Sequence, residues 1–277
     1  MTNIFVEKAV IPAAGLGSRM LPITKSIPKE MLPAGRKPMI QHVVEEAVAS
    51  CLTQICIVIR KGKEAIRDYF CLRYPHKKDH GIEELERLTA SCEITFAYQE
   101  QPRGLGDALL QARDFVGGDP FVMMIPDQLM RANPPATSQL LKCTKSGSAI
   151  CSSLLKIPKA EIPFFPGARG FRCEQISGSN EFLMGRIQTE EETVRLYRDL
   201  DHEVRGFGRT IYPPVIFDYL GEDFVNPQTG EVDLLKTFEQ CVTEVEHRGV
   251  LLEGEPFDLG TFTGYYHYLP RLWETSD

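Results

Sequence analysis

The chain has 277 residues and a formal net charge of −7, with 43% hydrophobic and 25% charged residues. This length suits one large α/β domain, and the composition is that of a folded globular protein. The negative charge argues against a general nucleic-acid-binding surface, because such surfaces are basic. No apolar stretch has the length of a membrane span, and the first residues, "MTNIFVEKAV", lack the apolar core of a signal peptide. We therefore expect a cytoplasmic protein without a nucleic-acid or membrane partner.

The eight cysteines indicate free thiols, not a metal site. No pair has the CxxC spacing of zinc ligands, and most of the cysteines lie in apolar runs such as "QICIVIR" (54–60). Buried free thiols in a reducing cytoplasm are the simpler interpretation.

Strand and helix patterns alternate over the first 130 residues. Short apolar or β-branched runs predict strands at 6–15, 54–60, 92–99 and 120–128. Helical spacing of apolar residues predicts helices at 37–51, 62–70, 83–88 and 105–116. The alternation predicts an α/β fold with a mostly parallel sheet that is covered by helices on both faces. Ligands of such sheets bind at the carboxyl ends of the strands, which here are 12–17, 99–104 and Asp127.

The second half of the chain has weaker patterns. Strands are expected at 148–157 and 247–254, and "FRCEQI" and "EFLMGRIQ" are expected to form a hairpin around "SGSN". The charged segment 190–206 has helical character, and 207–221 together with 231–242 indicates a strand and two helices. A last helix at 263–273 is expected to break near Pro270. No linker separates domains.

The loop after the first predicted strand has residues that suit an anion. Gly15 and Gly17 allow the backbone to approach a ligand closely and to turn its N–H groups toward it. The spacing is neither that of a Walker A loop nor that of a full dinucleotide fingerprint, since Met20 stands in place of the third glycine. Arg19 and Lys29 follow as cations.

Prolines recur through the segment that carries these cations. Pro22, Pro28 and Pro33 exclude a long helix and limit the freedom of the backbone. A cationic side chain held in this way loses less entropy when it binds a phosphate. A solvated basic loop that connects a strand to a helix is the alternative, and the whole pattern favours a phosphate site.

The segment "AAGLGSRMLPITKSIPKEMLP" (13–33) resembles the signature of the sugar-1-phosphate nucleotidylyltransferases, and is most similar to that of the bacterial UTP–glucose-1-phosphate uridylyltransferases. The family pattern, G-x-G-T/S-R-x-x-P-x-T-K-x-x-P-K-x-M-L-P, is matched nearly throughout. The resemblance implies a Rossmann-like nucleotidyltransferase (GT-A-like) three-layer fold with a mixed, mostly parallel central sheet. It also implies a single domain over 1–277, with a nucleotide-binding half at about 5–130 and a sugar-binding half with C-terminal elements at about 131–277.

The reaction that the resemblance implies joins UTP to a sugar 1-phosphate, such as glucose 1-phosphate, and releases pyrophosphate with Mg²⁺ as cofactor. An oxygen of the sugar phosphate attacks the α-phosphorus in line, without a protein nucleophile. By the same resemblance, Arg19 holds the triphosphate and Lys29 neutralises charge near the α-phosphate. Ala14, Gly15 and Gly17 are expected to contact the nucleotide.

Other segments resemble further parts of the family's site. In "QPRGLGDAL" (101–109), Gln101 and Gly104 match the residues that read the pyrimidine, and an amide offers the donor and acceptor that uracil requires. Thymine has the same polar edge, so a thymidylyltransferase is an alternative. In "IPDQ" and "FDLGT", Asp127 and Asp258 match the magnesium ligands, and carboxylate oxygens suit this ion.

The resemblance is strong over about 5–130 and thins afterwards. The family's V-E-K-P motif, whose lysine holds the phosphate of the sugar 1-phosphate, has no counterpart near 181–200. Arg186 is the nearest substitute, with an altered sugar as one possibility, and a lysine from elsewhere in the fold is the alternative. Gly170 lies in the segment that matches the family's sugar-contacting Y-G-V. Loss of the lysine leaves a second hypothesis, a protein that binds a nucleotide or UDP-sugar with weak or lost turnover. Family members often form dimers or tetramers, so a homo-oligomer is compatible with the resemblance.

Overall fold

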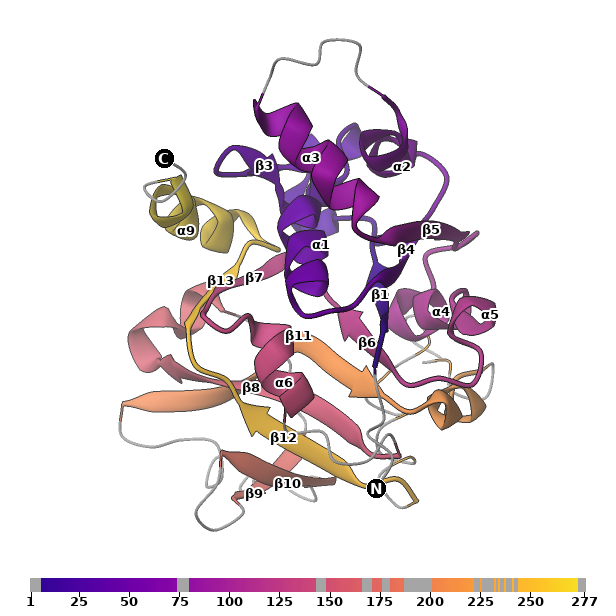
Figure 1. The fold of residues 1–277 in the computed structure, drawn as a ribbon. Helices are drawn as coiled ribbons and strands as arrows, with labels where there is room; N and C mark the ends of the chain where they lie inside the picture. The colour runs from indigo at the N-terminus through magenta and orange to yellow at the C-terminus, as the bar shows by residue number, and fades with distance from the viewer. Residues whose placement is uncertain are drawn as a thin grey trace.

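The structure, a computed structural model, has one large sheet with helices on both sides (Figure 1). It describes residues 6–73, 80–142, 148–165, 171–175, 180–186, 201–221 and 244–273, together with the single positions 225, 232, 234, 237 and 241.

The N-terminal part of the sheet is parallel. Its strands are β1 (Lys8–Pro12), β4 (Gln54–Ile59), β5 (Glu93–Tyr98) and β6 (Phe121–Met124). β1 pairs in parallel with β4 and with β6, and β4 pairs in parallel with β5. Parallel neighbours end at the same edge of a sheet, so the loops after all four strands gather there.

The rest of the sheet is mixed. Its strands are β8 (Ile150–Pro158), β9 (Phe171–Gln175), β10 (Glu181–Arg186), β11 (His202–Tyr212) and β12 (His247–Leu251). β11 is antiparallel to β6 and β8, β12 is parallel to β8, and β10 is antiparallel to β12 and β9. The order is β5-β4-β1-β6-β11-β8-β12-β10-β9. The predicted α/β fold with a mixed central sheet is confirmed.

Alternate residues of β1 belong to two separate hydrophobic cores, which gives the predicted three layers. Ala9 and Ile11 pack in one core, and Val10 in the other. The first core includes residues of α1 (Met39–Ala49), α2 (Glu64–Cys71), α3 (His80–Ala90), α6 (Ala136–Lys142) and α9 (Phe262–Trp273). The second includes residues of α4 (Gly104–Leu110), α5 (Arg113–Val116) and the 3-10 turn η5 (Pro214–Tyr219). None of the described helices combines the length and apolar character that a membrane crossing requires.

Two short strand pairs lie outside the main sheet. β2 (Pro33–Ala34) pairs with β3 (Lys37–Pro38), and β7 (Gln128–Arg131) pairs with β13 (Glu255–Asp258), both antiparallel. The second pair brings a late part of the chain to the end of β6, next to Asp127.

Two predicted elements of the N-terminal half are corrected by the structure. The helix predicted at 105–116 is divided into α4 and α5, because the N–H of Ala112 donates to Leu109 O (2.9 Å) and this tight turn ends α4. The strand predicted at 120–128 ends at Met124, and Gln128 begins the separate strand β7 after a turn.

In the second half, the predicted hairpin is confirmed by the antiparallel pairing of β9 and β10. The helical character predicted for 190–206 is wrong from His202 onward, where β11 begins, and residues 187–200 lie outside the described residues. The predicted break near Pro270 does not occur. α9 continues to Trp273, because a proline there removes only one hydrogen bond from the last turn. Most of 231–242 also lies outside the described residues.

The cysteines agree only in part with the expectation of buried thiols. Cys51, Cys56, Cys71, Cys92 and Cys241 are free thiols, and Cys56, Cys151 and Cys241 are buried. Cys51, which follows the C-cap of α1, and Cys71, the last residue of α2, are exposed.

Candidate active site

The proline-rich segment after β1 folds as three short 3-10 turns and forms no long helix, as its prolines predict. These are η1 (Ser18–Met20), η2 (Ile23–Lys25) and η3 (Lys29–Met31). Gly17 has a φ of 68°, and a Cβ there would lie 3.0 Å from Thr24 Cβ, so this turn favours glycine. Thr24 Oγ1 donates to Gly17 O (2.8 Å), and Met20 is fully buried beneath the arm. The arm is therefore fixed to the protein and presents Arg19, which is exposed, at the sheet edge.

A buried ion pair fastens the last turn of this arm. Lys63 Nζ donates to both carboxylate oxygens of Glu30 (3.0 and 2.8 Å) and to Ala13 O (2.7 Å). Burial lowers the pKa of Lys63 even though Glu30 acts in the opposite direction. The pair joins η3 to the end of β1 and to the start of α2, and it was not predicted from the sequence.

Lys29 and Asp127 meet at the centre of the edge. Lys29 Nζ lies 2.6 Å from Asp127 Oδ2. Burial raises the pKa of Asp127, but the charge and hydrogen bond of Lys29, with the charge of Arg19, bring it below its ordinary value. Burial lowers the pKa of Lys29, and Asp127 and Glu30 outweigh it, so that this pKa is raised. Both groups are therefore charged.

Asp258 ends β13 beside this pair. Gln128 Nε2 donates to Asp258 Oδ2 (3.1 Å), and the N–H of Gly260 donates to Oδ1 (3.0 Å). Burial and then the charge of Asp127 raise the pKa of Asp258 to about 6. A Cβ on Gly260 would lie 2.5 Å from Asp127 Oδ2 and 3.2 Å from Asp258 Oδ1, so the two carboxylates share one small space.

The four residues predicted to bind phosphate or metal therefore come together. They are Arg19, Lys29, Asp127 and Asp258. The charge of Arg19 acts on Lys29, Asp127 and Asp258 alike. Among the described residues, no group of three or more His, Cys, Asp or Glu side chains forms a complete metal site. Two carboxylates do fit Mg²⁺, which takes further oxygen ligands from phosphates and water.

The segment predicted to read the base lies at the carboxyl end of β5, on the same sheet edge. Gln101 is exposed, and Gly104, with a φ of 88°, begins α4. Gln99 Nε2 donates to Gly104 O (3.0 Å) and to Asp107 Oδ2 (2.8 Å), while Arg103 Nη2 donates to Asp107 Oδ1 (2.9 Å). The buried carboxylate of Asp107 thus holds the loop in a fixed shape.

The residues predicted for the sugar phosphate are not tested by the part of the chain that the structure describes. Gly170 lies outside the described residues, and Arg186 ends β10 opposite Phe171, with a side chain that is not described. The segment 187–200, where the family's lysine motif would fall, is also outside the described part. These two assignments stay predictions.

Comparison with known proteins places the chain in a family. A family model described as "Nucleotidyl transferase" matches residues 8–161. UTP–glucose-1-phosphate uridylyltransferase 2 of Streptococcus pyogenes serotype M3 is 44% identical over 273 residues, which cover 94% of this chain and 88% of the relative. UTP–glucose-1-phosphate uridylyltransferase 1 of the same serotype is 34% identical over 272 residues, which cover 94% of this chain and 86% of the relative.

Solved structures show the same fold. An apo UDP-glucose pyrophosphorylase matches 98% of this chain with 99% of its own, at a TM-score of 0.83 and 24% identity. A UTP-bound UGPase from Acinetobacter baumannii matches 96% of this chain with 93% of its own, at a TM-score of 0.78 and 26% identity. Since the family model covers more than half of the chain and the two relatives cover nearly all of it, the chain belongs to the nucleotidyl transferase family and is a nucleotidyltransferase enzyme.

Proposed function

We propose that this enzyme transfers the uridylyl group of UTP to glucose 1-phosphate, giving UDP-glucose and pyrophosphate. The observation that carries the proposal is the convergence of Arg19, Lys29, Asp127 and Asp258 at one sheet edge. Relatives named for this reaction cover nearly the whole chain, which supports the choice of UTP and glucose 1-phosphate.

Asp127 and Asp258 would hold Mg²⁺. Gly260, which has no side chain, lets both carboxylates lie against the same point, and the two supply the hard oxygen ligands that this ion prefers. Bound Mg²⁺ would neutralise phosphate charge and polarise the reacting phosphate.

The chain's own residues would act by position and charge, because the in-line attack needs no protein nucleophile. Arg19 is exposed at the arm and would hold the triphosphate with its fork of donors. Lys29, fixed beside Asp127, would neutralise charge near the α-phosphate as the oxygen of the sugar phosphate approaches. Ala14, Gly15 and Gly17 would line the nucleotide.

Gln101 and Gly104 would read the uracil. The exposed amide of Gln101 offers both a donor and an acceptor, and Asp107 keeps the loop in place for a rigid contact. Thymine presents the same polar edge, so transfer from dTTP is the alternative on the nucleotide side.

A protein that binds UTP or UDP-glucose with weak turnover is the second candidate. It is favoured by one observation, the lack of the family's sugar-phosphate lysine motif in the sequence. Two converging carboxylates favour the enzyme, because a binding protein has little use for both. Arg186 is our candidate for the missing cation, and Gly170 for the sugar contact.

Pyrophosphate release with Mg²⁺, measured for a matrix of nucleoside triphosphates and sugar 1-phosphates, separates these functions. We expect the fastest release with UTP and glucose 1-phosphate. Faster release with dTTP would identify a thymidylyltransferase. Calorimetric binding of UTP or UDP-glucose without release for any pair would contradict the enzymatic proposal and support the binding protein.

We further propose a cytoplasmic location. Cys51, Cys56, Cys71, Cys92 and Cys241 are free thiols, which suits a reducing compartment.

A further inference from the structure

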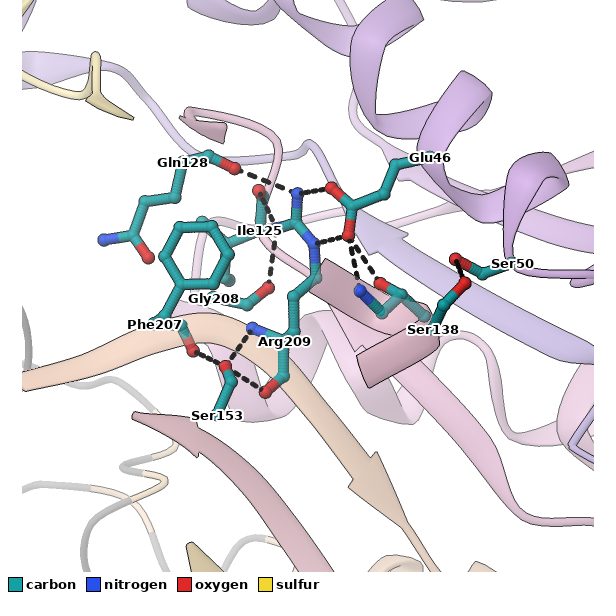
Figure 2. A network of polar contacts seen from close by, with 10 residues as sticks. Glu46, Ser50, Ile125, Gln128, Ser138, Ser153, Phe207, Gly208 and Arg209 are labelled. Atoms are coloured by element: carbon teal, nitrogen blue, oxygen red, sulfur yellow. Dashed lines mark hydrogen bonds and ion pairs between the residues drawn. The ribbon is translucent and has the colours of Figure 1, made fainter. Parts of the chain in front are cut away.

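Arg209 of β11 is the largest fully buried side chain among the described residues, and its charge has no part in the chemistry above (Figure 2). Its Nε donates to Glu46 Oε1 (2.9 Å) and its Nη2 to Glu46 Oε2 (2.7 Å). Three more hydrogen bonds go to backbone carbonyls. Every N–H that a guanidinium offers is therefore used.

Two of these carbonyls lie on either side of Asp127. Nη1 of Arg209 donates to Ile125 O (3.1 Å), and Nη2 donates to Gln128 O (3.0 Å). One planar group thus holds both ends of the turn between β6 and β7 (Figure 2). Nη1 also donates to Gly208 O (2.9 Å), which in turn accepts the N–H of Ile125 (2.8 Å). The turn that carries Asp127 is therefore attached at two points to the rigid, planar guanidinium of Arg209, which we call the fork.

The local shape of β11 allows this contact. The register of β11 against β8 shifts at a bulge next to Arg209, and bulges redirect side chains. Ser153 Oγ donates to Arg209 O (2.7 Å) within the bulge. A Cβ on Gly208 would lie 2.5 Å from Ile125 Cβ, so the strand can approach the turn only with glycine there.

Glu46 connects the fork to two helices. It lies on α1. Besides the bonds from Arg209, its carboxylate accepts hydrogen bonds from the N–H (3.0 Å) and from the Oγ1 hydroxyl (2.6 Å) of Thr137, at the start of α6. Burial raises the pKa of Glu46, but Arg209 and Thr137 bring it below its ordinary value, so the pair is charged. Helices α1 and α6 therefore fix the orientation of the guanidinium.

The second carboxylate is linked to the same fork through Gln128. Arg209 holds the backbone of Gln128, and the Gln128 side chain donates to Asp258 Oδ2 (3.1 Å). A buried ion pair is a weak source of stability, because the loss of hydration offsets the attraction of the charges. A role in orientation accounts better for a fork whose bonds surround one turn.

We propose that Arg209, oriented by Glu46, is a positioning residue that sets the distance and direction of Asp127 and Asp258 for their shared metal ion. This role rests on the proposed function, because the two carboxylates are taken as magnesium ligands. Groups that orient metal ligands in this way change metal affinity or activity by about 10- to 100-fold when they are removed.

Two variants test this role. E46Q/R209M removes both charges together and keeps an acceptor for Thr137, and R209K keeps the charge but loses the planar fork. In the double variant we expect faster amide hydrogen exchange in 125–131 than in the wild type. The half-saturating Mg²⁺ concentration should rise about 10-fold, with a similar fall in kcat. In R209K we expect hydrogen exchange, the half-saturating Mg²⁺ concentration and kcat to change in the same direction as in the double variant. The KM for glucose 1-phosphate should stay unchanged.

Phe121→Leu is the matched control. Phe121 is a fully buried residue at the start of β6, in the core that includes residues of α4, α5 and η5. It should lower the Tm without changing exchange in 125–131 or the Mg²⁺ requirement. Wild-type exchange and Mg²⁺ requirement in folded E46Q/R209M would overturn the role. If the double variant does not fold, wild-type exchange and a wild-type Mg²⁺ requirement in R209K would overturn the positioning role of Arg209. If the wild-type protein releases no pyrophosphate, the proposed function fails, and the exchange measurement still decides whether the fork holds the turn.

Discussion

Asp127 and Asp258 share a buried space and yet differ in proton affinity. Lys29 and Arg19 overcome the effect of burial on Asp127 and keep its pKa low, whereas burial and the charge of Asp127 raise the pKa of Asp258 to about 6. A cation bound between the two would favour the charged form of both. At the scale of residues, the site is therefore arranged to receive positive charge.

Lys29→Ala should reduce kcat by about 10²-fold or more, because it removes one fixed electrostatic donor from the reaction centre. Steady-state pyrophosphate release with UTP and glucose 1-phosphate measures the change. Lys142→Ala, at an exposed position at the end of α6, is the control and should leave kcat unchanged. Wild-type kinetics in Lys29→Ala would contradict the role of this lysine.

Gly260→Ala should raise the half-saturating Mg²⁺ concentration and lower kcat. The added Cβ would lie 2.5 Å from Asp127 Oδ2, and that carboxylate would have to move. Gly118→Ala is a matched control, because a Cβ there meets nothing within 4 Å. If Gly260→Ala and Gly118→Ala have the same half-saturating Mg²⁺ concentration, the space that Asp127 and Asp258 share does not determine the Mg²⁺ requirement.

At the scale of elements, the arm between β1 and β2 depends on a contact with a residue outside the arm. Its three 3-10 turns have only local backbone hydrogen bonds of their own, and the Glu30–Lys63 pair joins the last turn to Ala13. Lys29 precedes Glu30 directly. The position of Lys29 therefore follows from the buried pair.

Lys63→Met should lower the free energy of unfolding by about 3–5 kcal/mol, because it leaves the buried Glu30 charge without a partner. Glu30→Gln/Lys63→Met removes both charges and should recover most of this loss. Urea denaturation of the two variants, with Lys61→Met at a neighbouring exposed position as the control, measures the difference. Equal stability of the single and double variants would show that the pair is not coupled.

The elements that were predicted correctly have signals contained within themselves. β-branched runs and helical spacing identified β1, β4, β5 and α1 because their burial follows the local pattern. The strand predicted at 120–128 was too long, since β7 exists only through its partner β13, far along the chain. Pairing of that kind has no local signal.

At the scale of the whole molecule, the sheet joins two halves of the chain through β6 and β11, and Glu46 and Arg209 cross this junction. The two residues are 163 positions apart. The signature pointed to Arg19 and Lys29, and the resemblance pointed to Asp127 and Asp258, as candidates. The contacts of Arg209 were missed because its partners meet only in the folded chain. A single arginine within the apolar run "GFGRTIYPP" was the available signal.

Glu46 makes stability depend on pH in a defined window. Its folded pKa is lowered from 4.5, so its contribution is present above that value and is lost as the pH falls through the folded pKa. The difference in free energy of unfolding between wild type and Glu46→Gln should be largest near neutral pH and narrow below 4.5. Denaturant titrations from pH 7 to pH 3 test this. A difference that stays constant over that range would contradict the assignment.

The most direct test of the proposed reaction follows the α-phosphorus of UTP. With UTP labelled at the α-phosphorus, glucose 1-phosphate and Mg²⁺, we expect the label in UDP-glucose and the release of unlabelled pyrophosphate. Incubation of UDP-glucose with pyrophosphate should return UTP. Label that stays in UTP, or that appears only in UMP, would contradict uridylyl transfer to the sugar phosphate.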